Sequence, residues 1–243
     1  MALSHGPERI PKVFDDLKFW ANFPKQYLKS GNFSTDFYDA AQNLRIDQIN
    51  STTGTTSVPG YNSVAPNFNN SVYWRCSDAA GTGVDMAGGT TLVMWLYATD
   101  ITERDTVFEK AGTTNNSYEQ EIACTWETGE TISWYSRVST YDYGNTASIG
   151  TSGWKMVGIR MSTGKQSGVA RAGYYSINGA NWASSYTSRS TNVITPAGEL
   201  RIGTGYAGVV ESGAVSQVMV WDRDLTDTEI ASVWNHTRDW HGV

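Results

Sequence analysis

Two acidic residues, Glu119 and Glu121, are the first place in this 243-residue sequence where the residue types suggest chemistry. Alternate residues of a strand point to the same face, so the two carboxylates would lie together. A retaining glycoside hydrolase uses two carboxylates about 5 Å apart. No third acid follows at the spacing of a catalytic strand, because Thr125 and Trp126 precede Glu127. Paired acids on a strand are usually a solvated outer face, so we predict no catalytic residue here.

The three histidines, His5, His236 and His241, all lie near the ends of the chain. A polysaccharide lyase, a Ser-His-Asp triad and a histidine metal site each need a histidine that the fold places in the site. We therefore expect no histidine on a sheet face and none of these sites. Neither a P-loop nor a dinucleotide-binding fingerprint is present in the sequence.

Exposed aromatic residues in polar loops are the remaining candidates for a specific site. Tyr141, Tyr143, Trp182 and Tyr206 are each flanked by Gly, Asn, Asp or Thr. Sugars present apolar C–H faces that stack on aromatic rings, and their hydroxyls need amide and hydroxyl partners. These four residues are the candidate carbohydrate-binding residues. The alternative is that each ring packs against a neighbouring loop or another subunit, since aromatic residues are also favoured at protein interfaces.

Composition and charge exclude several classes of partner. The formal net charge is −6, whereas a protein that binds a phosphate backbone needs clustered Lys and Arg. No segment approaches the roughly 20 apolar residues of a membrane span, and the first residues lack the apolar core of a signal peptide. We expect no nucleic-acid partner, no membrane insertion, and synthesis in the cytoplasm of the host cell. Cys76 and Cys124 are too few for a disulfide scaffold and are expected to be buried small hydrophobic residues, although a disulfide between them stays open.

The apolar patterns predict an all-β domain after a short arm. Residues 1–15 carry two prolines and mixed charges with little periodicity, so they are expected to form an N-terminal arm. Residues 16–243 are expected to form one domain, in which both alternating sets of residues 90–98 are apolar and predict a strand covered on both faces. Short strands separated by turns at roughly ten-residue intervals indicate a two-sheet antiparallel sandwich or jelly roll. Further strands are expected near residues 17–23, 44–49, 71–74, 106–111, 118–126, 131–138, 154–162, 173–177, 199–204 and 214–221.

Two local signals are sharper than the rest. Asn178-Gly179 is a dipeptide that supplies positive φ at both central positions of a type I′ hairpin turn. Thr226 and Glu229 have the spacing of a capping box, and apolar residues follow at helical spacing. We predict a helix from Asp227 to about Arg238 and no other helix, with residues 25–70 rich in loops.

Several segments occur in the order and spacing of a known family. The sequence resembles the laminin-G-like, concanavalin A-like jelly-roll domains over residues 16–240, which implies a concanavalin A-like jelly-roll sandwich with one short C-terminal helix. The segments that carry the resemblance are VFEKAG (107–112), SYEQEIACTWETGETISWYSR (117–137), WKMVGIRMSTGK (154–165), YYSINGANW (174–182), LRIGTGYAG (200–208) and VMVWDRDLTDTEI (218–230).

The N-terminal segment is similar to the opening of concanavalin A-like virion proteins of tailed phages. The matching positions are Gly6-Pro7, Leu17, residues 22–27, Ser30-Gly31 and residues 38–43. The sequence departs from that pattern at Asn22, where the family has Asp. The resemblance implies a structural, decoration or adhesion protein of a phage virion, on the capsid surface or the tail. Its partners would be other virion proteins and further copies of itself, with host surface glycans as a further candidate.

Calcium is the one ion that the resemblance raises. Many domains of this family bind it between an early Asp-containing turn and the penultimate strand, positions that fall at Asp39 and in residues 214–221 here. Calcium needs oxygen ligands that include carboxylates, but Ser216 and Gln217 are neutral. Asp39 is therefore the weak calcium candidate, and we favour a metal-free domain in which Asp39 forms a turn through an Asx hydrogen bond.

The leading hypothesis is thus a non-enzymatic structural protein of a virion, and a second hypothesis adds glycan binding as an adhesion module. The alternative is a polysaccharide-acting enzyme of the same fold, a glycoside hydrolase or a lyase, which would need Glu119 and Glu121 as catalytic groups.

Overall fold

The structure is a computed structural model, and part of the chain is described. The described residues are 11–33, 36–49, 54–68, 73–76, 89–97, 105–111, 120–137, 141–150, 153–162, 172–187, 199–205, 208–209 and 213–243.

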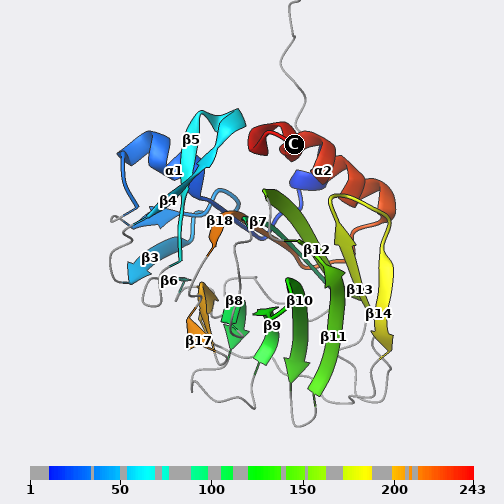
Figure 1. Cartoon of the computed structure of the whole chain (residues 1–243). Helices are drawn as coiled ribbons and strands as arrows, with labels where there is room; N and C mark the ends of the chain where they lie inside the picture. The colour runs from blue at the N-terminus through cyan, green and yellow to red at the C-terminus, as the bar shows by residue number, and fades with distance from the viewer. Residues whose placement is uncertain are drawn as a thin grey trace, which may run out of the picture.

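Two large sheets make up this described part of the chain (Figure 1). The first sheet has the order β1-β18-β7-β12-β13-β14, and every neighbouring pair in it is antiparallel. Its strands are Phe19–Asn22 (β1), Thr90–Tyr97 (β7), Trp154–Ser162 (β12), Ala172–Ile177 (β13), Ala183–Thr187 (β14) and Ala214–Trp221 (β18).

The second sheet has the order β11-β10-β9-β8-β15-β6-β3-β2, with two short strands, β16 and β17, attached beside β8. A separate hairpin, β4-β5, lies near the C-terminal helix. The strands are Phe37–Tyr38 (β2), Arg45–Ile49 (β3), Thr55–Val58 (β4), Ser63–Pro66 (β5), Tyr73–Cys76 (β6), Asp105–Ala111 (β8), Gln120–Glu127 (β9), Thr131–Arg137 (β10), Tyr141–Ser148 (β11), Leu200–Ile202 (β15), Thr204–Gly205 (β16) and Gly208–Val209 (β17). The predicted two-sheet antiparallel sandwich is confirmed.

Strand β7 is buried on both faces, as its two apolar sets predict. Leu92, Met94 and Leu96 point into the main core between the sheets. Val93 and Trp95 point to the outer face of the first sheet, where they join a second apolar cluster. The first sheet therefore separates two cores, and a layer outside the sandwich must cover its outer face.

The C-terminal helix α2, Asp227–His241, provides part of that cover (Figure 1). Its predicted capping box is present, because the Thr226 hydroxyl accepts from the backbone N–H of Glu229 and the Glu229 carboxylate accepts from the N–H of Thr226. The helix ends three residues later than expected, at His241, where Gly242 has the left-handed φ of 72°. The buried face of α2 lies against the second core through Ile230 and Val233.

The N-terminal segment joins this outer layer earlier than the sequence suggests. Residues Lys12–Phe14 form a short 3-10 helix, η1, and both Val13 and Phe14 are buried. The Trp221 indole donates a hydrogen bond of 2.7 Å to the carbonyl of Val13. Part of the expected arm of residues 1–15 is therefore packed against the domain. Residues 1–10 lie outside the described ranges, so the division into arm and domain stays a prediction.

A second helix, α1 (Phe23–Ser30), was not expected, so the prediction of a single helix is wrong. The Asn22 side chain caps it by accepting from the N–H of Lys25 at 3.1 Å, and Pro24 lies in its first turn. Gly31 ends it with a φ of 74°. The run of apolar residues from Leu17 predicts a strand that includes Phe23, but the strand stops one residue earlier because the Asn-x-Pro signal starts a helix.

The predicted turn at Asn178-Gly179 and the burial of both cysteines are confirmed. Asn178 and Gly179 have φ values of 52° and 73°, the two positive values of the expected turn. Cys76 and Cys124 are fully buried and form no disulfide with each other. Among the described residues, no helix is long and apolar enough to cross a bilayer. A further 3-10 helix, η2 (Pro59–Tyr61), follows β4.

Candidate functional site

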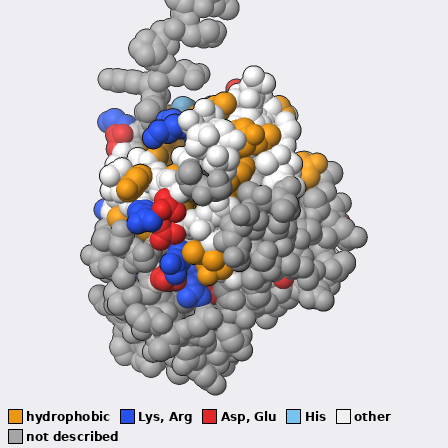
Figure 2. Space-filling model, turned by 90° about the vertical axis from the view of Figure 1, so that its left-hand side faces the viewer, with side chains coloured by type: hydrophobic (Ala, Val, Ile, Leu, Met, Phe, Trp, Pro, Cys, Tyr) orange, Lys and Arg blue, Asp and Glu red, His pale blue; other side chains and the backbone are white. Residues whose placement is uncertain are grey.

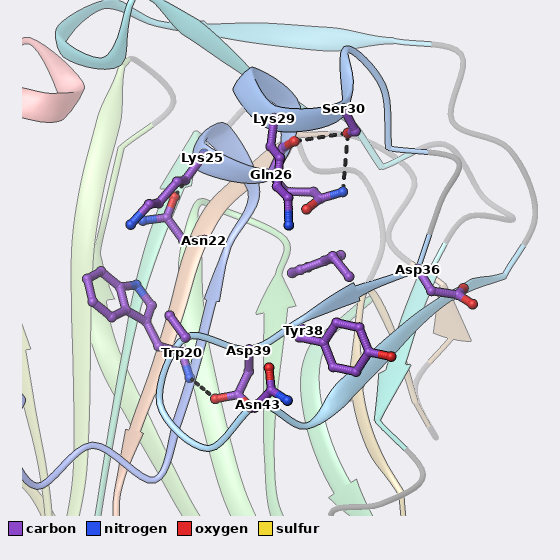
Figure 3. Close-up of a pocket in the computed structure, with 12 residues that line it drawn as sticks. Trp20, Asn22, Lys25, Gln26, Lys29, Ser30, Asp36, Tyr38, Asp39 and Asn43 are labelled. Atoms are coloured by element: carbon purple, nitrogen blue, oxygen red, sulfur yellow. Dashed lines mark hydrogen bonds between the residues drawn. The ribbon is translucent and has the colours of Figure 1, made fainter.

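A cleft of about 490 Å³ opens between α1 and the turn that joins β2 to β3 (Figure 3). Residues of α1 form one wall, and residues of β1, β2 and the following turn form the other. The lining contains aromatic, amide, ammonium and carboxylate groups: Trp20, Asn22, Lys25, Gln26, Lys29, Ser30, Asp36, Phe37, Tyr38, Asp39, Ala40 and Asn43.

Helix α1 places Lys25, Gln26 and Lys29 along the cleft (Figure 3). Residues four apart lie on the same side of a helix, so the two lysines are neighbours on its surface. Both lysines are exposed. Gln26 is held by Ser30, because its amide donates to the Ser30 hydroxyl at 3.2 Å and that hydroxyl donates to the Gln26 carbonyl at 2.9 Å.

Trp20 is half-buried, and a chain of hydrogen bonds beneath it fixes its ring. Its indole N–H donates to the Gln217 amide oxygen at 3.1 Å. The amide nitrogen of Gln217 donates to the Tyr61 hydroxyl at 3.3 Å, and the amide nitrogen of Asn22 donates to the same hydroxyl at 2.9 Å. Burial raises the pKa of Tyr61. Gln217 and Tyr61 are therefore positioning residues that link the Trp20 wall to the cap of α1.

The opposite wall depends on Asp39. One oxygen of this buried carboxylate accepts from the backbone N–H groups of Trp20 (3.3 Å), Ala41 (2.9 Å) and Gln42 (3.1 Å). The other oxygen accepts from the N–H of Leu44 at 2.5 Å. This is the Asx-type turn that the sequence indicates, and it joins β1 to the turn after β2. Next to it, the Tyr38 ring is 58% exposed, so its face is open to solvent.

The carboxylates of the cleft are already engaged. Asp36 forms an ion pair with Arg45, which also pairs with Asp47 at 2.8 Å. Further ion pairs join Asp47 of β3 to Arg75 of β6, and Arg75 to Glu199, which precedes β15. The face that carries α1 and β3 therefore shows acidic and basic side chains next to each other (Figure 2). The positive charge of Arg45 is thus offset, whereas Lys25 and Lys29 make no ion pair with any carboxylate of the described chain.

The carbohydrate-binding residues that the sequence predicts lie elsewhere. Trp182 follows the Asn178-Gly179 turn at the far edge of the first sheet, and Tyr141 and Tyr143 belong to β11 in the second sheet. The side chains of these two tyrosines, and all of Tyr206, lie outside what the structure describes, as do Glu119 and the side chain of Glu121. The roles of these residues therefore stay predictions.

Trp182 has close neighbours on its ring. The Arg160 guanidinium lies 4.9 Å from the ring centroid, and it lies 4.3 Å from that of Tyr174. The ring edge packs over Gly158, where an added Cβ would lie 3.0 Å from it. The indole N–H has no hydrogen-bond partner among the described residues. The ring therefore packs against Arg160 and is only partly free for a ligand.

Ser216 and Gln217 do not face a metal site. A β-bulge in β18 sets both residues opposite Trp95 of β7, on the outer face of the first sheet. There Gln217 contacts Trp20 and Tyr61, and Ser216 contacts a histidine of α2. Within the described ranges, no group of three His, Cys, Asp or Glu side chains is placed to hold a metal ion. The preference for a metal-free domain, with Asp39 as the weak calcium candidate, stays a prediction.

The expectation that no histidine lies on a sheet face is wrong. The His241 ring stacks on Trp95 with a centroid distance of 3.8 Å and an angle of 4°. Its Nδ1 is 2.9 Å from the carbonyl of Thr237, and its Nε2 is 2.5 Å from the Ser216 hydroxyl. The chain end returns to the sheet because the final turn of α2 lies over β7 and β18. His241 thus holds the helix in place and is closed to substrate.

The residues of the cleft were not identified from the sequence, because no single segment contains a recognisable motif for them. The sequence contained one usable signal, the Asn22 cap with Pro24 and Gly31, which defines α1 and so places Lys25 and Lys29 together. The position of Trp20 beside the turn at Asp39 follows only from the fold.

Comparisons with known proteins show the fold. No family model matches the sequence, and no curated protein matches it. Domain 4 of AbnA, an extracellular arabinanase from Geobacillus stearothermophilus solved with arabinotriose, is 14% identical with a TM-score of 0.61, over 90% of this chain and 98% of that one.

Botulinum neurotoxin structures match as well. One match is a structure of botulinum neurotoxin type C, whose cell entry is reported to depend on interaction with two ganglioside molecules. It is 9% identical with a TM-score of 0.63, over 93% of this chain and 52% of that one. The binding domain of neurotoxin DC in complex with SialylT is 11% identical, with a TM-score of 0.63 over 92% and 52% of the two chains. This chain spans about half the length of those neurotoxin chains. At such identities the likeness establishes a jelly-roll sandwich.

Proposed function

We propose that this chain is a non-catalytic carbohydrate-binding domain and that the cleft beside α1 holds the sugar. The observation that carries the proposal is the pairing of two aromatic residues, Trp20 and Tyr38, with amide groups in one cleft of about 490 Å³. A sugar ring needs both an apolar stacking surface and hydrogen-bond partners for its hydroxyls. Tyr38 offers an open ring face, while Gln26 and Asn43 offer amides.

The cleft is suited to binding and not to hydrolysis. A glycosidase needs one carboxylate that is free to act as a nucleophile or base and one that carries a proton. Asp36 is held by Arg45, and both oxygens of Asp39 accept backbone N–H groups. Neither carboxylate is available to a substrate, which supports a non-enzymatic role for this site.

The structural neighbours support carbohydrate binding as the class of function. The arabinanase domain was solved with arabinotriose, and the type C neurotoxin is reported to depend on ganglioside molecules. Each of these ligands is a carbohydrate or carries one. The neighbours therefore favour sugar binding as the class of function, while the cleft residues of this chain propose the place.

A glycan array tests the proposal with two matched variants. Tyr38→Ala removes an exposed ring from the cleft, and Leu28→Ala removes an equally exposed side chain, at 58% each, that does not line it. We expect about a tenfold loss of glycan affinity for Tyr38→Ala, equivalent to about 1.4 kcal/mol of binding free energy, and no loss for Leu28→Ala. An array without signal for the unaltered protein would contradict the proposal.

The aromatic residues predicted from the sequence supply the competing location. If Trp182→Ala, Tyr141→Ala, Tyr143→Ala or Tyr206→Ala abolished the signal while Tyr38→Ala kept it, the sugar would bind at those residues and not at the cleft. Turnover of a polysaccharide that Glu119→Gln or Glu121→Gln abolished would instead favour the enzyme of the same fold.

The proposed setting is the virion of a tailed phage, where the domain would act as a structural, decoration or adhesion protein beside other virion proteins and further copies of itself. The proposal rests on the resemblance of the N-terminal segment, from Gly6-Pro7 to residues 38–43. Mass spectrometry of purified particles tests it directly, and absence of this chain from the particles would remove its support.

A further inference from the structure

We propose that the cleft beside α1 selects acidic saccharides, those that bear a carboxylate or a sulfate group, over neutral ones. This inference rests on the proposed function, because it names the class of sugar for the same cleft. It starts from the two lysines of α1, Lys25 and Lys29, which line the cleft and are both exposed (Figure 3).

The first step is the charge balance of the cleft. Four charged residues line it: Lys25, Lys29, Asp36 and Asp39. Asp36 is engaged in an ion pair with Arg45. The buried carboxylate of Asp39 accepts hydrogen bonds from four backbone N–H groups. The two ammonium groups are left without a carboxylate partner in the described chain, so they are available to an anionic ligand although the net charge of the protein is −6.

The second step is where these charges lie. Lys25 and Lys29 are one helical turn apart, so their ammonium groups can reach the same ligand from one wall. Trp20 and Tyr38 lie on the other wall, as the close-up of the cleft shows (Figure 3). A sugar ring stacked on the aromatic wall would thus turn an acidic substituent toward α1. Charge-assisted hydrogen bonds to that substituent are about twice as strong as those to a neutral hydroxyl.

The third step is that the helix is fixed before any ligand arrives. The Asn22 side chain caps α1, and the amide of that same side chain donates to Tyr61, which Gln217 also contacts. Gln217 in turn holds Trp20. One hydrogen-bonded chain therefore sets both the lysine wall and the aromatic wall, which favours a ligand that uses the two together.

The experiment measures binding of ligand pairs that differ only in charge. Titration calorimetry would compare a galacturonate oligosaccharide with its methyl ester, and a sulfated galactan oligosaccharide with its desulfated form. The two pairs distinguish a carboxylate from a sulfate as the preferred group. We expect the acidic member of at least one pair to bind about tenfold more tightly. Raising the salt from about 0.1 M to about 1 M shortens the screening length from about 10 Å to about 3 Å and should remove most of that difference.

The variants locate the effect. Lys25→Gln combined with Lys29→Gln should lower the ratio of acidic to neutral affinity from about ten to near one, which is about threefold for each lysine. Lys12→Gln combined with Lys155→Gln removes the same charge away from the cleft and should keep the ratio. Tyr38→Ala should weaken binding of both members of a pair.

The outcomes separate the two proposals. Equal affinity for acidic and neutral members, with dependence on Tyr38, would overturn the selectivity and leave carbohydrate binding in place. No binding of any member would overturn both. Binding of the acidic members that needs the lysines but not Tyr38 would reveal a simple anion site and would also overturn the inference.

Discussion

Mild acid should destabilise this protein because His241 is buried in a form that cannot take up a proton. Its ring is 2% exposed and stacks on Trp95. The carbonyl of Thr237 can only accept, so Nδ1 carries the hydrogen and Nε2 accepts from the Ser216 hydroxyl. Burial lowers the pKa of His241 to about 3, although its hydrogen bond to Thr237 acts in the opposite direction.

The sign and size of the effect follow from that value. An unfolded histidine has a pKa of 6.5, so between pH 6.5 and about 3 the unfolded chain binds a proton that the folded protein does not. The stability from His241 is complete above pH 6.5 and is lost as the pH falls toward 3. Each pH unit costs about 1.4 kcal/mol, so from pH 7.5 to pH 5 the loss is about 2 kcal/mol. For a domain of this size that is a fall in Tm of about 4–8 °C.

Urea unfolding at several pH values checks this, and variants isolate His241 from the carboxylates that also titrate. His241→Phe combined with Ser216→Ala keeps a ring on Trp95 and removes both polar partners. Its free energy of unfolding, relative to the unaltered protein, should rise by about 2 kcal/mol between pH 7.5 and pH 5. Ser216→Ala alone keeps the buried imidazole and should retain the acid loss.

Parallel pH profiles for the double variant and the unaltered protein would refute the reasoning, because they would mean that His241 titrates alike in the folded and unfolded states. A histidine NMR signal that titrates near pH 6.5 in the folded protein and is absent in the double variant would refute it independently.

Other changes have equally direct outcomes. Thr226→Ala should lower the free energy of unfolding by about 1 kcal/mol in urea titrations, because it removes the capping box of α2. Gly179→Ala should cost about 2–3 kcal/mol in the same assay, since φ is +73° and the new Cβ would lie 2.4 Å from the Cβ of Trp234. Asp39→Ala should cost about 2–3 kcal/mol by leaving backbone N–H groups unpaired, and it should weaken sugar binding. EDTA should leave the Tm unchanged, and a calcium-dependent rise in Tm that Asp39→Ala abolished would instead establish a metal site.

Elements with a strong internal pattern could be predicted from the sequence. The two apolar faces of residues 90–98 define β7, and Thr226 with Glu229 defines the start of α2. Helix α1 could have been predicted as well, but eight residues provide little periodicity, and the apolar run before them favours a strand. The cap signal at Asn22 competes with that run, and the end of the strand at Asn22 is known only from the structure.

The cleft could not be predicted because its geometry depends on contacts between distant parts of the chain. Trp20 is held by Gln217, 197 positions away, and Asn22 contacts Tyr61. The sequence predicts sugar-binding aromatic residues from their polar neighbours in the chain. Such neighbours do not determine whether a face of the aromatic ring is exposed to solvent in the folded protein. Trp182 illustrates the difference, since its ring lies under Arg160. Tyr38 was overlooked, and it is the exposed tyrosine of the cleft.

The absence of an acid in β18 follows from the layer that covers it. The bulge after Val215 gives Ser216 and Gln217 the same outward direction, where both are fully buried. A carboxylate at either position would be a charge without solvent, which is costly unless a cation lies beside it. Gln217 instead accepts from Trp20 and donates to Tyr61, a pair of roles that an ionised glutamate cannot fill. Because position 217 is a neutral glutamine, this strand offers no carboxylate to a calcium ion there, and the same Gln217 side chain orients Trp20 in the cleft.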